Sequence, residues 1–147
     1  MIETLRTWAQ RVWVERDEAA IDAMLAPDVA AHGLGGQTLI GPAAFKQFHA
    51  ALCRLLRGTE LVIDHHVEAD GWLAALCTFK GVAQDGRKVA ITGTIYGRIA
   101  DGKILEAYNH FDFLGLFAQL GLLPPDVLLR CLAGKPGGPS GTQLLAD

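Results

Sequence analysis

Apolar residues near the start of the chain recur every three or four positions, which is the spacing of an amphipathic helix. One such run covers residues 3–25, and its apolar positions are Leu5, Trp8, Ala9, Val12, Trp13, Ala20, Ala23 and Met24. We expect one long helix here, broken near Asp17, because that carboxylate followed by Glu18 is suited to cap a second helical piece. Pro27 and Asp28 are expected to end the helical region.

A second helix is predicted between Gly41 and Gly58. Pro42 suits its first position, where no amide partner is needed, and glycine is a common residue at a helix end. Between the two helical regions, the letters VAAHG indicate a short extended segment, and GLGGQ supplies turn chemistry.

From Glu60 onward the pattern changes to strands separated by hairpin turns. Three Asp-Gly pairs are each flanked by β-branched and aromatic residues: Asp70-Gly71, Asp85-Gly86 and Asp101-Gly102. Asp-Gly favours a type I′ turn, which needs positive backbone φ at both central residues. The pairs divide residues 60–113 into four strands of an antiparallel meander. The strand WLAALCTFKGVA is apolar on both faces near its start, so we expect helices to cover one face and a second subunit the other.

Helices before strands, with a further helix after them, predict an α+β fold in which a cavity forms between helices and sheet. The letters FLGLFAQLG predict a short helix that Pro124 and Pro125 stop, and PDVLLRCLAG adds a turn or two. GKPGGPSGT has the composition of a linker. We therefore expect one domain over residues 1–125 and a partly mobile C-terminal extension over residues 126–147.

Composition narrows the class of protein. The formal net charge is −3 and no stripe of Lys and Arg occurs, so we expect no nucleic-acid partner and no membrane partner. Three widely spaced cysteines, without a C-x-x-C pair, argue against disulfides and a zinc ribbon and favour a reducing, cytoplasmic location. The charged N-terminal segment does not resemble a signal peptide.

The richest chemistry lies in the segment KILEAYNHFDFLG, residues 103–115. In a strand, alternate side chains share a face, so Tyr108, His110 and Asp112 are predicted to line one wall, with Glu106 on the same side. These groups can donate, accept or transfer protons. The five histidines show no metal-binding spacing and no phosphate-binding loop appears, so we expect neither metal nor cofactor.

Three blocks of the chain, RVWVERDEAAIDAMLAPDVAAHG, GPAAFKQFHAAL and IADGKILEAYNHFDFLGLFAQLGLLP, resemble the SnoaL-like polyketide cyclase family of the nuclear transport factor 2-like superfamily. The resemblance covers residues 8–125 and implies a cone-shaped α+β barrel, usually dimeric, with an apolar pocket. It also implies ring closure by intramolecular aldol condensation without metal or cofactor. The family's general acid-base is an aspartate near the end of the final strand, and Asp112 stands at the matching place. Where family members carry a hydrogen-bonding pair that includes histidine, this chain has Tyr96 and Arg98.

Each candidate side chain has a functional and a structural interpretation. Asp112 would take a proton from carbon if it faced a pocket, but an aspartate before FLGLFAQLG is also a good helix cap. His110 would relay protons, since histidine titrates near physiological pH. Five further residues are predicted to contact substrate or the pocket rim, each with plain packing or solvation as the alternative: Tyr108, His32, Trp13, Tyr96 and Arg98.

We therefore predict a homodimeric, cofactor-free cyclase or isomerase that acts on a small hydrophobic carbonyl compound, with Asp112 and His110 as catalytic residues. One alternative is a domain that binds a hydrophobic ligand without converting it. Another is an epoxide hydrolase, for which Glu106 would be the second acid. A pocket-facing Asp112 favours the enzyme, and a helix-capping Asp112 favours the binding domain.

Overall fold

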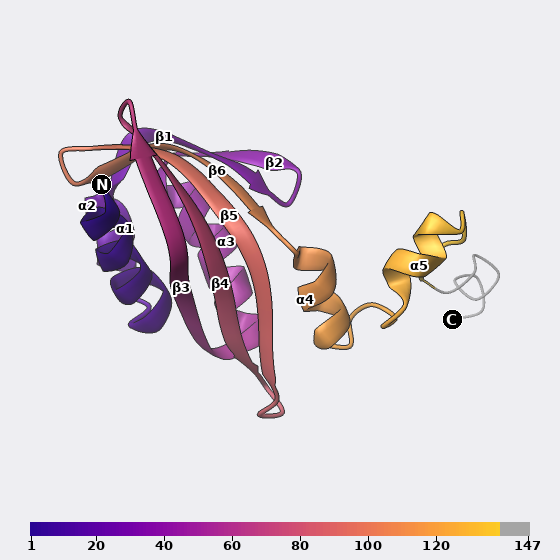
Figure 1. The fold of residues 1–147 in the computed structure, drawn as a ribbon. Helices are drawn as coiled ribbons and strands as arrows, with labels where there is room; N and C mark the ends of the chain where they lie inside the picture. The colour runs from indigo at the N-terminus through magenta and orange to yellow at the C-terminus, as the bar shows by residue number, and fades with distance from the viewer. Residues whose placement is uncertain (139–147) are drawn as a thin grey trace. The chain divides into compact units, whose positions relative to one another are not determined.

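The computed structural model describes residues 1–138 and separates into two compact units, Met1–Phe111 and a second unit that begins at Asp112 (Figure 1). Of the predicted extension 126–147, residues 139–147 lie outside the described part. The first unit contains, in order, α1 (Ile2–Trp8), the π-helix η1 (Ala9–Val14), α2 (Glu18–Met24), β1 (Leu25–Leu34), β2 (Gln37–Ile40), α3 (Gly41–Leu55), β3 (Leu56–Ala69), β4 (Trp72–Ala83), β5 (Lys88–Ala100) and β6 (Lys103–Phe111). The second contains α4 (Phe113–Gln119) and α5 (Val127–Leu132).

The six strands of the first unit form one curved sheet in the order β2-β1-β6-β5-β4-β3 (Figure 1). Strands β3 to β6 pair consecutively and antiparallel, which confirms the predicted four-strand meander. The sheet also contains a pairing between distant parts of the chain, because β1 lies parallel to β6. The predicted α+β fold with a curved sheet packed on helices is therefore confirmed.

Two of the three Asp-Gly hairpins have the predicted type I′ turn. Both residues have positive φ at Asp70-Gly71 and at Asp101-Gly102. The prediction is wrong at Asp85-Gly86, where only the glycine has positive φ (91°) and the amide of Ala83 donates to the carbonyl of Arg87. The Asp85 side chain is bonded to the Arg87 amide and guanidinium, at 3.0 and 2.7 Å. This loop is therefore one residue longer than a type I′ hairpin.

The points where the helices are interrupted or end depend on the conformation and side chains of nearby residues. The N-terminal helical region is interrupted at Arg16, which has φ 56°, and the carboxylate of Asp17 then accepts hydrogen bonds from the amides of Ala19 and Ala20. This confirms the predicted break and cap. The second helix, α3, ends at Leu55 rather than at Gly58, because Leu56 is already extended and begins β3.

The π-helix η1 is held in place by two buried polar side chains. A π-helix shifts its hydrogen bonds by one residue, and the amide of Glu15 accordingly donates to the carbonyl of Gln10 at 3.0 Å. Near its end, the carbonyl of Val12 accepts from Nε2 of His49 at 2.8 Å, and the carbonyl of Trp13 accepts from the hydroxyl of Thr59. These side chains from α3 and β3 therefore satisfy the carbonyls that the helix releases.

The core of the first unit lies between the helices and one face of the sheet. Trp13 packs edge-on against Phe79 of β4, with ring centres 5.1 Å apart, and Phe79 pairs in register with Ile91 of β5. Along β5 every odd-numbered residue from Val89 to Ile99 is buried or half-buried, and the even-numbered residues are exposed. We call the face that carries Phe79 the inner face and the opposite one the outer face.

The second unit begins with α4, whose N-cap is Asp112. The helix ends at Gln119, ahead of Pro124, because Gly121 adopts φ 74°. Around this glycine, the amide of Leu122 donates to the carbonyl of Phe117 and the amide of Gly121 to that of Ala118, which is a Schellman end. The expectation that Pro124 and Pro125 stop this helix is therefore wrong, while the two predicted helices themselves are confirmed.

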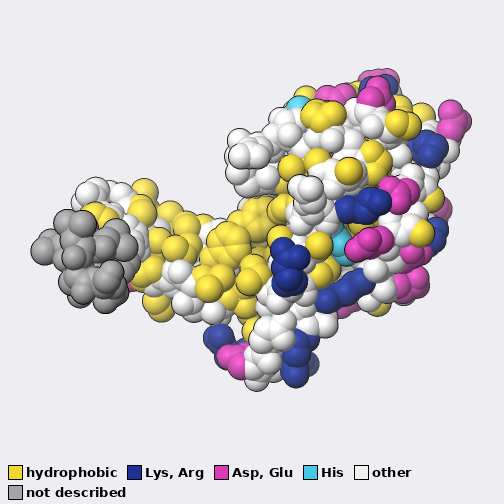
Figure 2. Space-filling model, turned by 180° about the vertical axis from the view of Figure 1, so that it is seen from behind, with side chains coloured by type: hydrophobic (Ala, Val, Ile, Leu, Met, Phe, Trp, Pro, Cys, Tyr) yellow, Lys and Arg dark blue, Asp and Glu magenta, His cyan; other side chains and the backbone are white. Residues whose placement is uncertain are grey.

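The surface of the second unit is rich in apolar side chains (Figure 2). Its large exposed hydrophobic residues are Leu114, Leu122, Leu128, Leu129 and Leu132. Within residues 1–138, no helix combines the length and the apolar character that crossing a bilayer requires.

Candidate functional site

The strand register aligns the predicted site residues across three neighbouring strands. Tyr96 of β5 lies opposite Tyr108 of β6, and Tyr108 lies beside His32 of β1. One step along, Arg98 lies opposite Glu106. Because Tyr96 and Arg98 are even-numbered residues of β5, this whole group lies on the outer face.

Two stacked ring pairs form a row on this face. The imidazole of His32 stacks on the ring of Tyr108, with centres 4.4 Å apart and planes 12° from parallel. The indole of Trp72 stacks on Tyr96 at 4.6 Å and 11°. Sequence reasoning missed Trp72, although its place directly after the Asp70-Gly71 turn made it the first residue of β4. The two pairs lie next to each other across β4, β5, β6 and β1, because Tyr96 is opposite Tyr108.

A polar network surrounds the carboxylate of Glu106. The Tyr108 hydroxyl donates to Oε1 of Glu106 at 3.0 Å, and Nε2 of His32 is 4.0 Å from the same oxygen. Nε of Arg98 is 3.8 Å from Oε2. The side chains of Glu106 and His32 are 25% and 30% exposed, so water reaches them only in part. We call Glu106, Tyr108, His32 and Arg98 the Glu106 cluster.

A residue from β2 orients the imidazole of this cluster. Nδ1 of His32 lies 3.1 Å from the hydroxyl of Thr38, which is within hydrogen-bond range. That contact leaves Nε2 directed toward Glu106. Thr38 was not singled out in the sequence, because β2 is a short edge strand and its pairing with β1 gives no local signal.

The carboxylate of Glu106 raises the pKa of Tyr108, first through the hydrogen bond and then through its negative charge. Ionising the phenol would remove the donated hydrogen and place two anions side by side. Tyr108 therefore stays a neutral hydrogen-bond donor across the physiological pH range.

A tyrosinate titration checks this coupling. The chain has two tyrosines, so in a Tyr96→Phe background ultraviolet absorbance reports Tyr108 alone. We expect it to ionise above the ordinary value of 10.0, and to move down toward that value when Glu106→Gln is added. Because the raised pKa belongs to the folded state, the stability that it contributes is present below pH 10 and is lost as the pH rises further. Identical titration curves with and without Glu106→Gln would contradict the coupling.

The remaining predicted residues lie in other surroundings. His110 is on the same face of β6 and pairs in register with Thr94, but it is exposed. Trp13 is buried in the core on the inner side, against the rings of Phe79, Phe45 and His49. Contact of either residue with a substrate stays a prediction.

Asp112 caps the helix that follows it. Its Oδ1 accepts from the amide of Gly115 at 2.9 Å, and its carbonyl accepts from the amide of Leu116. Asp112 opens the second unit, whereas Glu106 belongs to the first. The structural interpretation of Asp112 is thus observed, and its catalytic role stays a prediction.

The inner face of β6 presents an amide where acid-base chemistry would need an acid. Asn109 pairs with the buried Ile95, and its Nδ2 donates to the carbonyl of His32 at 3.1 Å. A carboxamide does not exchange a proton near neutral pH. The proton-handling groups of β6, Glu106 and Tyr108, therefore lie on the outer face and not between the helices and the sheet, where we predicted the pocket.

Residues 1–138 hold no evident metal cluster, and burial reduces the reactivity of two of their three thiols. No three His, Cys, Asp or Glu side chains converge there as metal ligands would. Burial raises the pKa of Cys53, and it raises that of Cys77 to about 11, with the Asp64 charge as a smaller cause. Both thiols are therefore poor nucleophiles.

A family model described as SnoaL-like polyketide cyclase matches residues 3–120, most of the chain. The chain belongs to this family. The resemblance identified in the sequence is thereby confirmed. No curated protein matches the chain.

Solved structures of other SnoaL-like and related proteins share the fold. A Jannaschia protein described as a SnoaL-like polyketide cyclase is 17% identical, with TM-score 0.70 over 84% of this chain and 92% of that one. IdmH of Streptomyces antibioticus, a proposed polyketide cyclase, is 18% identical, with TM-score 0.71 over 81% and 96%. TerC, crystallised with polyporic acid, is 23% identical, with TM-score 0.69 over 82% and 97%. These similarities establish the cone fold of nuclear transport factor 2-like proteins.

Proposed function

We propose that this SnoaL-like chain is a cofactor-free enzyme that moves protons on a hydrophobic carbonyl compound, as a cyclase or isomerase. The supporting observation is the Glu106 cluster, in which a neutral phenol, an imidazole and a guanidinium each lie within 4.0 Å of one half-buried carboxylate. Membership of the SnoaL-like polyketide cyclase family supports the same class of reaction.

Three groups of the cluster have a chemical task in this proposal. The Glu106 carboxylate takes the proton from the carbon next to a carbonyl, so that the C–H bond breaks and an O–H bond forms on Glu106. The negative charge that develops on the carbonyl oxygen is stabilised by Arg98, and by the Tyr108 hydroxyl once its single hydrogen turns from Glu106 to that oxygen. In a cyclase, the enolate carbon then bonds to a second carbonyl carbon of the same molecule, and the resulting alkoxide takes a proton back. In an isomerase, the proton returns to a different carbon.

The row of rings beside the cluster supports a flat, hydrophobic substrate. The Trp72 and Tyr96 pair lies next to Tyr108, and Tyr96 is 47% exposed. Because the rings of each pair stack on one another, a planar ring system that lies on the row gains buried apolar area and contacts with ring edges. We therefore propose an aromatic or polycyclic ketone as the substrate class.

The proposal is tested by hydrogen exchange at carbon. The probe is 1-indanone, a planar aromatic ketone, incubated with the protein in deuterated buffer at neutral pH and followed by NMR. We expect the hydrogens beside its carbonyl to exchange faster than in buffer alone, with the rate saturating as the ketone concentration rises. A rate equal to the buffer background would contradict the enzyme proposal.

A second candidate function is binding without conversion, and the helix cap formed by Asp112 favours it. Capping its own helix gives Asp112 a structural role, so its presence in the chain does not require a catalytic one. The same experiment separates the two functions. A binding domain would show 1-indanone shifting the NMR signals of Tyr108 and His32 while the exchange stays at background.

Epoxide hydrolysis and a homodimer both stay predictions. Epoxide hydrolysis would need Glu106 and Asp112 to act on one water molecule. A homodimer through the outer face would use the exposed apolar residues Val67 of β3 and Leu76 of β4, which lie on that face.

A further inference from the structure

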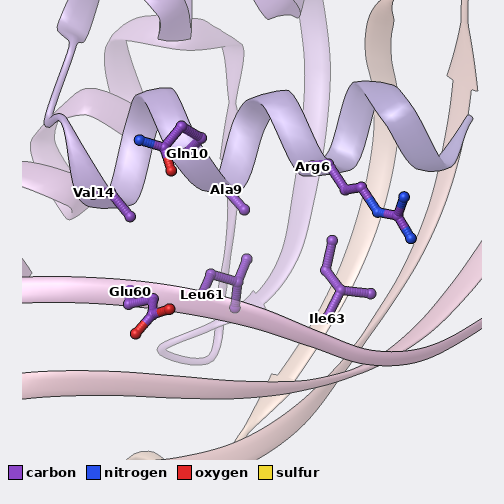
Figure 3. A pocket seen from close by; sticks show the side chains of 7 residues that line it. All are labelled: Arg6, Ala9, Gln10, Val14, Glu60, Leu61 and Ile63. Carbon is purple, nitrogen blue, oxygen red and sulfur yellow. The ribbon is translucent and has the colours of Figure 1, made fainter.

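A cleft of about 200 Å³ lies between the N-terminal helices and strand β3 (Figure 3). The helices contribute Arg6, Ala9, Gln10 and Val14, and the strand contributes Glu60, Leu61 and Ile63. Strand β3 is an edge of the sheet, so the cleft opens at the sheet margin. It is separate from the Glu106 cluster, which lies on β1, β5 and β6 on the outer face.

The wall of this cleft is formed by the π-helix. Ala9, Gln10 and Val14 all belong to η1, and π-helical turns occur frequently at functional sites. The hydrogen bonds from His49 and Thr59 to the carbonyls of Val12 and Trp13 hold this turn in place. The cleft is thus preformed, which lowers the entropic cost of binding a ligand.

The charges around the cleft favour an anion at one end. Arg6 is the only cation among the seven lining residues. Its present partner is Glu3, at 3.0 Å, in a pair whose side chains are 57% and 80% exposed. Such an exposed pair contributes little stability, so a ligand carboxylate can replace Glu3.

Glu60 does not counteract an anion in the cleft. In Figure 3 its carboxylate points away from the helix, whereas Leu61 and Ile63 point toward it. Glu60 lies opposite Lys80 across the β3 and β4 pairing, on the outer face. Between Arg6 and Val14 the cleft therefore combines the apolar side chains of Ala9, Leu61 and Ile63 with the carboxamide of Gln10, whose Nε2 donates to Glu15 at 3.0 Å.

We propose that this cleft binds a small carboxylate with an apolar body. The carboxylate contacts the Arg6 guanidinium, and the apolar body lies on Ala9, Leu61 and Ile63. The volume equals that of about seven water molecules in the liquid, which limits the ligand to a short chain or a single ring. This site is independent of the proposed catalytic site.

The test uses hexanoate, with hexan-1-ol and hexylammonium as probes of the same length and different charge. Binding to the full chain is followed by two-dimensional NMR at millimolar concentrations. We expect hexanoate to shift the signals of Ala9, Gln10 and Leu61 in a saturable way, and the alcohol and the ammonium to bind about tenfold more weakly, since a hydrogen bond to a charged group is lost.

Two arginine variants provide the matched comparison. Arg6→Gln is expected to weaken hexanoate binding about tenfold. Arg87→Gln removes an arginine with the same side-chain exposure, 57%, which forms a similar ion pair at a distant hairpin, and is expected to leave binding unchanged. Equal affinity for hexanoate and hexan-1-ol, an Arg6→Gln variant that binds as the parent does, or shifts confined to other parts of the chain would each overturn the proposal.

Discussion

Replacing Gly33 by alanine is expected to destabilise the first unit by about 3 kcal/mol or more, measured as the free energy of unfolding in urea. Gly33 has φ 81°, and a Cβ at this position would overlap the carbonyl oxygen of Asn109 in β6. Alanine therefore both strains the backbone and forces β1 away from β6. These two strands form the parallel pairing that brings His32 against Tyr108.

Gly35 provides the matched control for this prediction. It has nearly the same φ, 79°, but a Cβ there would meet no atom within 4 Å. Gly35→Ala should therefore show only the left-handed strain, about 1 to 2 kcal/mol. If both variants lose the same stability, close packing of β1 on β6 is not what requires a glycine at position 33.

The second large effect concerns catalysis. Glu106→Gln is expected to lower the rate of 1-indanone exchange by about a hundredfold or more, the usual contribution of a general base. Glutamine has nearly the same shape, and its carbonyl oxygen can still accept from Tyr108, but it does not take up a proton. The variant should therefore keep its fold and its ligand binding while losing the proton transfer.

Glu68→Gln serves as the control for this substitution. Glu68 is a carboxylate on β3 that accepts from the amide of Ile2, and it lies outside both proposed sites. Its replacement should leave the exchange rate as in the parent protein. A similar loss in both variants would indicate a general effect of charge or stability instead of catalysis by Glu106.

Local signals in the sequence were enough to predict much of the fold. Asp-Gly turns fix where a strand reverses, so the four-strand meander followed from three dipeptides. The helix break at Asp17 was equally local, because the aspartate caps amides two and three residues ahead. In the middle hairpin, whose turn differs from the prediction, the Asp85 side chain is bonded to Arg87, an interaction that no dipeptide rule contains.

Local signals could not predict which distant segments of the chain pair in the sheet. The parallel contact between β1 and β6 joins residues 77 positions apart, as in the hydrogen bond from Asn109 to His32. Nothing near either residue encodes it. The π-helix is a second case, since the side chains that satisfy its carbonyls, His49 and Thr59, come from α3 and β3.

The alternation of side chains along β6 also did not show on which face of the sheet the candidate site lies. In β6, Tyr108 and His110 alternate with Asn109 and Phe111, so both faces mix polar and aromatic groups. The register with β5 decides the question, because Tyr108 pairs with Tyr96, and Tyr96 lies on the face opposite Trp13. The sequence did not reveal that Arg98 and His32 lie close to Glu106, because these contacts depend on the pairing of β6 with β5 and with β1.

The most direct test is the ratio of 1-indanone exchange rates between the parent protein and Glu106→Gln, measured in one deuterated buffer with folding of both verified. We predict a ratio of about a hundred or more. A ratio near one would show that the Glu106 carboxylate takes no part in proton transfer.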